Sequence, residues 1–355
     1  MIFGKRIYTS GNSLSQLAWN RFRKNSIGVI SLGVIIISVL IAVLGYLITP
    51  DSTPMCNNQV LEISTQRPGF ETDFLLVRKN TIEIKTTIFN KMLFGAPSNY
   101  KTIPVDAIEF DGDMVVAHIF DQDNNEFLEL FNIADVCYPL AGDPIFNDDI
   151  MYFTTINGDE MQIPISELYS QVLDNNIKLK RYILGTDQFG RDLLSRLLIG
   201  SRISLSVGAI SVAISLLVGI FLGSMAGFYR GRTDDIIMWF INVVWSIPTL
   251  LLVIAITFAL GRGFWQIFVA VGLTMWVEVA RVVRGQIMSI REKEFVEAGF
   301  ALGYSNFRII FKHILPNIMS PVIVISAANF AAAILIEAGL SFLGIGVQPP
   351  MPSWG

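Results

Sequence analysis

Five long apolar stretches constrain this chain more than any other feature of its 355 residues. Each is close to the roughly 20 residues that an α-helix needs to cross a bilayer. They run approximately over residues 27–48, 203–227, 236–260, 264–280 and 318–338. The first is too long for the apolar core of a signal peptide, and no small-x-small cleavage site follows it before Pro50, so it is expected to remain as a helix. The sequence therefore predicts an all-α polytopic membrane protein.

Charged residues are few and unevenly distributed. They make up 16% of the chain, against about 25% in a soluble domain. Residues 51–177 hold 21 of the 30 acids and 6 of the 26 bases, whereas the rest of the chain has an excess of bases. Such a division indicates two parts in different surroundings. We divide the chain into a cytoplasmic N-terminus with the first helix (1–49), an acidic extracytoplasmic insert (50–180) and a membrane core (181–355).

The positions of Lys and Arg predict the orientation. Residues 1–25 carry five bases and no acid, which is typical of a cytoplasmic segment. Alternation from there places residues 50–200 outside and residues 281–317 inside, where basic residues gather again. We expect a multi-pass protein of the cytoplasmic (inner) membrane, surrounded by lipid.

Glycine and proline predict how the apolar helices pack. Pro248 is expected to kink the third span. Four glycines of the second span, with four-residue spacings within the set, are expected to permit close helix packing rather than to bind a ligand. These are Gly208, Gly219, Gly223 and Gly227.

The insert reads as a β-rich folded domain. Asn157-Gly158 inside Met151–Ile165 and Asp111-Gly112 before Met114–Phe120 are hairpin signals, and Thr81–Ile88 alternates like a strand. His118 lies in a strand-like run without metal-ligand spacing, so we expect a structural role and no metal site.

Both cysteines of the chain, Cys56 and Cys137, lie in the insert. Outside the membrane a disulfide between them would persist. The alternative is two unrelated buried thiols, and the sequence leaves both open.

The loop after the fourth span carries the most informative spacing. Apolar residues recur at helical intervals on both sides of Gly303, which predicts two short amphipathic helices that reverse direction there. The apolar stripe of the first helix is Phe295, Ala298 and Leu302, and that of the second is Phe307, Ile310, Phe311 and Ile314. The exposed apolar face of such a hairpin needs a partner, either its own membrane domain or another protein. The pattern is Glu297-Ala298-Gly299, three residues, Gly303, nine residues, and His313-Ile314-Leu315-Pro316-Asn317.

This spacing resembles the coupling loop of ABC importer permeases, whose pattern is E-A-A, three residues, G, nine residues and I-x-L-P. Gly299 replaces the second alanine and His313 the isoleucine, and the His-x-Leu-Pro-Asn form is that of the dipeptide/oligopeptide/nickel branch. The resemblance implies that loop 294–317 docks on an ATP-binding subunit. The residues implied in ATPase coupling are Glu297, Ala298, Gly299, Gly303, His313, Leu315 and Pro316.

Two further segments resemble the same branch. Leu184–Asp192 followed by Ser195-Arg196 is similar to L-G-T-D-x-x-G-R-D-x-x-S-R, and Leu340–Gly355 is similar to L-S-F-L-G-L-G-x-Q-P-P-x-P-S-W-G. Ordered motifs at compatible positions are a strong signal. The resemblance covers residues 184–355 and, loosely, 26–49, and it points to C-type permease subunits of dipeptide and oligopeptide importers. It implies the type I transmembrane-domain fold of ABC importers.

Several charged residues are candidates for the translocation pathway or its outer gate. Asp187, Arg191 and Asp192 suit a turn at the outer surface, where they either face a peptide terminus or only pin the loop. Glu337, near the outer end of the fifth span, either lines the pathway or lies at the interface. Glu278 is expected to lie near the inner end of the fourth span, within reach of Arg281.

The sequence contains no Gly-x-x-x-x-Gly-Lys-Ser/Thr, so ATP is expected to be bound and hydrolysed by separate partner subunits. It shows no metal-ligand cluster and no nucleophile–base set, so we expect no cofactor and no enzymatic activity. The partners that the resemblance implies are a second homologous permease, two ABC ATPases and an extracytoplasmic substrate-binding protein, with no nucleic acid. Relatives continue through one more span, so the final family helix is expected to be absent here.

The function that the resemblance implies is that of a permease subunit of an ATP-driven importer of peptides. Within the branch, the alternatives are nickel, glutathione or antimicrobial-peptide transport. An alternative of another class is a membrane-anchored binding or sensor module in which the insert is the working part.

Overall fold

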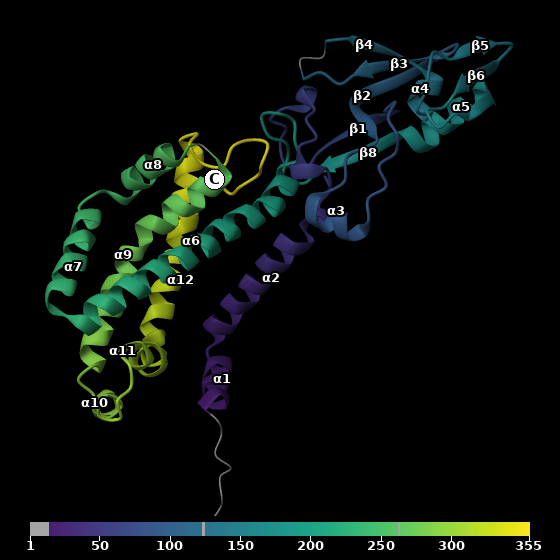
Figure 1. Ribbon diagram of the computed structural model, residues 1–355. Helices are drawn as coiled ribbons and strands as arrows, with labels where there is room; N and C mark the ends of the chain where they lie inside the picture. Colours follow the sequence, from purple (N-terminus) through teal and green to yellow (C-terminus); the bar gives the residue numbers. More distant parts are fainter. Residues whose placement is uncertain (1–13, 123–124, 262) are drawn as a thin grey trace, which may run out of the picture.

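The computed structural model describes residues 14–122, 125–261 and 263–355 and shows a helical bundle joined to a sheet-containing insert (Figure 1). The chain begins with α1 (Leu14–Lys24) and α2 (Ser26–Ile48). After the insert the helices continue as α6 (Leu193–Tyr229), α7 (Gly231–Trp245), α8 (Thr249–Leu260), α9 (Phe264–Ile290), α10 (Glu294–Ala301), α11 (Asn306–Arg308), a π-helical segment (Ile309–Ile314) and α12 (Leu315–Phe342).

The predicted spans appear as helices, with one correction. Among the described residues, four helices are long and apolar enough to cross a membrane: α2, α6, α9 and the continuous segment Asn306–Phe342. The third stretch was expected to be one span with a kink. It is instead divided into α7 and α8, which are bent by 95°. Proline has no N–H to continue a helix, so α7 stops before Pro248 and α8 starts after it. Counting the bent pair as one span gives five.

Glycines bring α6 and α9 into close contact, as the sequence predicted. A Cβ on Gly223 would lie 2.5 Å from the carbonyl oxygen of Ala280, and one on Gly227 would lie 2.8 Å from that of Arg284. A Cβ on Gly219 would lie 2.6 Å from the side chain of Val279 and 2.8 Å from the carbonyl oxygen of Trp276, and one on Gly208 would meet the ring of Phe330 on α12. The missing side chains let the two helix backbones approach, which is how small residues promote helix association in membranes.

Gly223→Ala is expected to lower the stability of the bundle by about 1–3 kcal/mol, because the added methyl overlaps the α9 backbone. Gly285→Ala on α9 is the matched control, since its Cβ would meet nothing within 4 Å. That substitution should be neutral or stabilise by up to about 1 kcal/mol, since alanine favours a helix. Thermal unfolding of the purified chain in detergent measures both changes. Equal midpoints for the two variants would contradict the close packing.

The insert is built on two antiparallel sheets. The larger has the order β4-β3-β2-β1-β8 and the smaller β5-β6-β7. The strands are β1 (Phe70–Arg78), β2 (Tyr100–Asp111), β3 (Met114–Ile119), β4 (Phe127–Asn132), β5 (Ile145–Asn147), β6 (Ile150–Thr154), β7 (Glu160–Pro164) and β8 (Ile177–Tyr182). The helices are α3 (Ile88–Phe94), α4 (Ile133–Cys137) and α5 (Ile165–Gln171), followed by a π-helical turn (Val172–Asn176).

The two hairpin predictions are confirmed, and one strand prediction is wrong. Asp111-Gly112 joins β2 to β3, and Asn157-Gly158 lies in the turn between β6 and β7. Thr81–Ile88 is not a strand. This segment has no neighbouring strand to pair with. β1 ends at Arg78, opposite Tyr100, and residues 79–99 leave the sheet. His118 lies on β3, 3.7 Å from Glu109, and no group of metal-ligating residues is found in the described part of the chain.

Both cysteines are free thiols, so the disulfide alternative is not realised. They belong to different cores. Cys56 is buried beside Tyr46 and Ile199, where the insert meets the helices. Cys137 packs against the main core of the insert, formed by the large sheet, α4, α5 and the small sheet. The sequence pattern could not separate these two environments.

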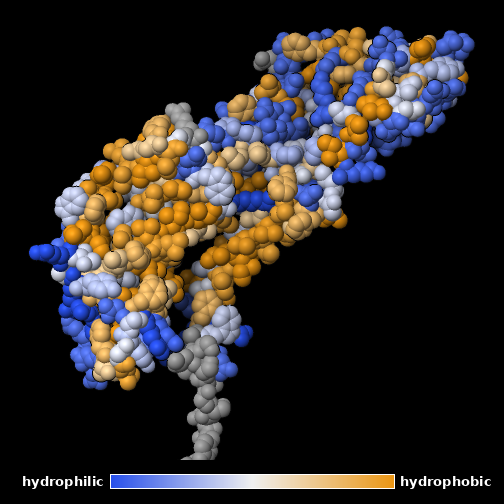
Figure 2. Space-filling view, in the orientation of Figure 1, coloured by the Kyte–Doolittle hydropathy of each residue, from blue (hydrophilic) through white to orange (hydrophobic). Residues whose placement is uncertain are grey.

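Polar and apolar surfaces are divided between the insert and the helices (Figure 2). The insert lies at one end, while α1, α10 and α11 lie at the other (Figure 1). Apolar residues dominate the visible surface of α2 and of the bundle, and polar residues are prominent on the insert (Figure 2).

Candidate functional site

The loop after α9 forms the predicted helical hairpin. Its first helix, α10, ends in a Schellman motif: the N–H of Tyr304 donates to the carbonyl of Gly299, and the N–H of Gly303 donates to that of Phe300. Gly303 has a φ of 73°. A Cβ at this position would meet nothing within 4 Å, so the glycine is required by its backbone conformation and not by space.

The inner face of the hairpin is fixed to the bundle. Val296 of α10 and Ile309 and Ile314 of the second segment are fully buried. They share a core with Val279, Val283 and Ile287 of α9 and Phe228 of α6. The hairpin is therefore packed on its own membrane domain on this side.

The outer face remains apolar and uncovered by the chain. Five large side chains are 42–70% exposed there: Phe295, Phe300, Leu302, Phe307 and Phe311. The prediction for α10 is confirmed, since Phe295, Ala298 and Leu302 are exposed together. In the second segment the predicted stripe is divided, with Phe307 and Phe311 outside but Ile310 and Ile314 inside. The reason is that residues 309–314 are π-helical, which changes the period on which the prediction relied.

The residues implied in coupling have distinct positions on the hairpin. Glu297 is exposed on α10, and no ion pair or side-chain hydrogen bond joins it to another described residue. Gly299 is buried. A Cβ added to it would lie 3.6 Å from the side chain of Ile309, which is an ordinary van der Waals contact. Leu315 is nearly buried, and Pro316 occupies the first turn of α12.

An aromatic stack, missed by the sequence analysis, closes the hairpin. The ring of His313 lies parallel to that of Tyr304, with centroids 5.5 Å apart. The guanidinium of Arg308 lies 4.1 Å from the centroid of the same tyrosine ring. His313 thus packs the second segment against the connection that follows Gly303, which gives this histidine a structural role. The only sequence feature that could have indicated a role for Tyr304 is its position directly after Gly303.

Gly303→Ala is expected to destabilise the hairpin by about 1–2 kcal/mol, because an L-residue is strained at a left-handed φ. Gly303→Asn should cost less, since asparagine tolerates this conformation. Gly299→Ala is the control and should be close to neutral. Hydrogen exchange of the amides in residues 299–304 reports the local stability. Equal protection in Gly303→Ala and Gly299→Ala would contradict the assignment.

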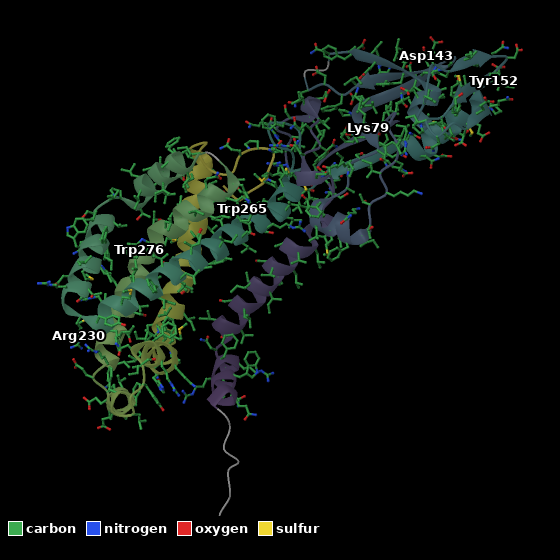
Figure 3. All side chains as sticks on the ribbon, in the orientation of Figure 1. Lys79, Asp143, Tyr152, Arg230, Trp265 and Trp276 are labelled. Atoms are coloured by element: carbon green, nitrogen blue, oxygen red, sulfur yellow. The ribbon has the colours of Figure 1, made fainter. Side chains whose placement is uncertain are left out.

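Two ion pairs tie the neighbouring helices at the same end of the bundle. Arg284 of α9 donates two hydrogen bonds to Asp234 of α7, at 2.5 and 2.6 Å. Arg230, labelled in Figure 3, lies between α6 and α7 and pairs with Glu292 at 2.8 Å. The hydrogen bond from Arg230 lowers the pKa of Glu292. The first pair joins α9 to α7, and the second joins the loop before the hairpin to the turn between α6 and α7.

The break between α7 and α8 is lined by charged and aromatic groups. The guanidinium of Arg281 lies 3.4 Å from the ring centroid of Trp245 and donates to Asn242 at 2.9 Å. Arg281 therefore has these partners rather than Glu278, which was expected within its reach. Glu278 is exposed and lines a recess with Trp245 and Thr274.

At the opposite end, Asp187 and Arg191 pin a loop. Arg191 donates to Asp187 at 2.7–2.8 Å and to Asn57 at 3.0 Å, and the two charged side chains are only 6% and 17% exposed. Burial raises the pKa of Asp187, but hydrogen bonds from Arg191 and from the N–H of Phe189 outweigh this and hold the pKa below its usual range. Gly190 lies against the backbone of Val60 with a φ of 69°, so no side chain fits there.

Asp192 caps the first turn of α6. It accepts hydrogen bonds from the N–H of Ser195, at 3.0 Å, and from the Ser195 hydroxyl. That hydroxyl also accepts from the N–H of Asp51, at 2.9 Å. Burial, with Asp51 and Asp192 nearby, raises the pKa of the Cys56 thiol to about 12. Of the two readings of this charged loop, the geometry favours pinning.

The motif that begins at Leu184 and the motif Leu340–Gly355 contact each other on α6. Arg196 donates to the carbonyl of Pro350, and the indole of Trp354 donates to the carbonyl of Leu197 at 3.1 Å. Glu337 lies below on α12 and is fully buried, accepting from Ser341 at 2.7 Å, while its second oxygen has no partner within the described residues. A place for Glu337 in the translocation pathway stays a prediction.

Asp187→Asn is expected to destabilise this junction by about 3 kcal/mol, because it leaves Arg191 buried without its counter-charge. The exposed pair between Lys101 and Glu129 is the control, and Glu129→Gln should cost less than about 1 kcal/mol. Because the pKa of Asp187 is lowered on folding, its carboxylate contributes to the free energy of unfolding at neutral pH. This contribution is lost as the pH falls below about 4. Unfolding at pH 7 and pH 3 measures this. An equal loss on acidification in the parent and in Asp187→Asn would contradict it.

Known families match both ends of the chain. The model of the binding-protein-dependent transport system inner membrane component matches residues 219–355, which contain the hairpin. Residues 219–355 are therefore similar to this family of permeases. A second model, the N-terminal TM domain of oligopeptide transport permease C, matches residues 13–66. The resemblance read from the motifs is therefore confirmed.

The curated relatives that this chain matches are named as transport permeases. The oligopeptide transport system permease protein OppC of Bacillus subtilis (strain 168) is 41% identical over 176 residues, covering 50% of this chain and 58% of the relative. The dipeptide transport system permease protein DppC of the same strain is 45% identical over 171 residues, covering 48% and 53%. The glutathione transport system permease protein GsiD of Pectobacterium atrosepticum is 40% identical over 172 residues, covering 48% and 57%. The chain thus spans somewhat more than half the length of these relatives.

Among solved structures, the MetNI methionine ABC transporter in inward-facing conformations is similar to 44% of this chain and 77% of its own chain. The identity is 18% and the TM-score is 0.40.

Proposed function

We propose that this permease is the membrane-spanning subunit of an ATP-driven ABC importer of peptides, and that it is not itself an enzyme. Three observations support the proposal: the family match, the relatives named for oligopeptide and dipeptide transport, and the ordered motifs of the sequence. Nickel and antimicrobial peptides remain alternative substrates of the branch. Glutathione is supported by one named relative.

The observation that carries the proposal is the two-sided hairpin. Its inner face is buried on α9, and its outer face leaves five large apolar side chains exposed beside the acids Glu294 and Glu297. Contiguous exposed apolar surface marks an interaction site. We infer that an ATP-binding subunit covers it. A membrane-anchored sensor, the alternative of another class, has no use for such a surface.

The hairpin has the connections that a coupling element needs. Its second segment continues into α12 without a break, and its core includes residues of α6 and α9. A displacement imposed by ATP-driven closure of the ATPases would therefore act on three helices at once. The proposed mechanism is alternating access, in which ATP binding favours one of two states by differential affinity.

The remaining assignments follow as parts of the same proposal. Two ATPases, a second homologous permease and an extracytoplasmic binding protein complete the importer. ATP is bound by those partners, and the N-terminus and hairpin face the cytoplasm of a cell whose inner membrane the helices span. The insert, at the other end of the bundle, is then extracytoplasmic (Figure 1).

Glu297→Ala is expected to reduce peptide uptake by about tenfold or more, because removing one partner of an interfacial charge pair costs 2 kcal/mol or more. Glu160→Ala is the matched control, an exposed acid on β7 of the insert. Uptake of a radiolabelled dipeptide and co-purification of the ATPase are measured together, with the amount of permease in the membrane. Full uptake in Glu297→Ala would contradict the coupling role.

A further inference from the structure

Residues 79–99, the excursion from the large sheet that contains α3, expose a cluster of large apolar side chains. Six of them are 40–75% exposed: Ile82, Ile84, Ile88, Phe89, Leu93 and Phe94. Nothing in the described chain covers this cluster, which lies outside the core of the insert. An exposed apolar surface of this kind implies an occupant.

Hydrogen bonds fix the depth of α3. The guanidinium of Arg202 on α6 donates to the carbonyls of Met92 and Leu93 at the end of α3, at 2.5 and 2.7 Å. The same guanidinium donates to the carbonyls of Ala42 and Val43 on α2. Ala42 lies six residues inside the end of α2 at Ile48, which is about 9 Å along the helix axis. The end of α3 therefore lies alongside the last turns of α2 and not beyond them (Figure 1).

The charge around α3 is opposite to that of the rest of the insert. Residues 78–101 contain five of the eight bases of the insert and, of its 21 acids, only Glu83. Lys85 is exposed and Lys91 is half-buried, and neither has an ion-pair partner within the part that the structure describes. Lys79, labelled in Figure 3, donates to the carbonyl of Ser98. A basic, apolar segment within an acidic domain is typical of a membrane-surface element.

We propose that α3 and the preceding residues 81–87 form an interfacial anchor that inserts into the lipid bilayer on the side of the insert. The apolar side chains lie among the acyl chains, and Lys85 and Lys91 extend to headgroup phosphates. Val43 and Leu47, on the part of α2 that Arg202 joins to α3, are also exposed. The proposal rests on α2 crossing the bilayer and does not depend on transport.

Nitroxide labels at two matched positions test the anchor. Ile88→Cys on α3 and Ile145→Cys on β5 replace isoleucines that are 75% and 67% exposed, so neither variant threatens folding. The unsubstituted full chain is the labelling blank, because burial raises the pKa of Cys56 and Cys137 to about 12. Each labelled chain is reconstituted in phosphatidylcholine vesicles with and without phosphatidylglycerol. Collision with oxygen, which concentrates in lipid, is compared with collision with a water-soluble nickel chelate.

The label at Ile88 should collide severalfold more with oxygen than with the nickel chelate, and the label at Ile145 should show the reverse. Adding phosphatidylglycerol should further lower the collision of the Ile88 label with the nickel chelate. The double variant Lys85→Gln with Lys91→Gln should not show this further decrease. An aqueous signature at Ile88 equal to that at Ile145 would overturn the proposal. Shielding from both reagents would also overturn it, because it would indicate a protein occupant.

Discussion

The close approach of α6 and α9 is the contact on which the rest of the bundle depends. It exists because Gly219, Gly223 and Gly227 present no side chain to a helix whose carbonyl oxygens lie within contact distance. Lipid supplies no hydrophobic driving force between helices, so association depends on this fit. α9 then places the hairpin at one end through Val283 and Ile287. α6 carries the junction with the insert at the other end.

The hairpin shows how one short segment serves two surfaces. Gly303 reverses the chain, and the π-helical segment that follows turns Ile310 and Ile314 inward while Phe307 and Phe311 stay outside. A regular α-helix would place side chains three and four residues apart on one face. The irregular segment divides them between the bundle and solvent. This division is the structural basis for assigning the outer face to a partner.

The sequence predicted the features that depend on local spacing and failed where tertiary contacts decide. The spans, the reversal at Gly303 and both hairpins follow from apolar length, glycine and turn residues. The sequence could not show that Thr81–Ile88 lacks a neighbouring strand, since pairing is set by the register of β1 with β2. Nor could it show that Arg281 prefers Asn242 and Trp245 to Glu278, because α7 and α9 meet only in the folded chain. The 95° break at Pro248 exceeds what one proline predicts.

The insert is held at both of its ends, which distinguishes it from a domain on a flexible linker. Asp51, at its start, and Asp192, after its end, share the hydroxyl of Ser195 in the first turn of α6. Arg202, two turns further along, holds α3 and α2 with one guanidinium. All three contacts are made with α6, the helix that packs on α9. The insert is therefore joined to the same closely packed pair of helices that carries the hairpin, so a rotation of α6 that keeps these contacts carries the base of the insert and α3 with it.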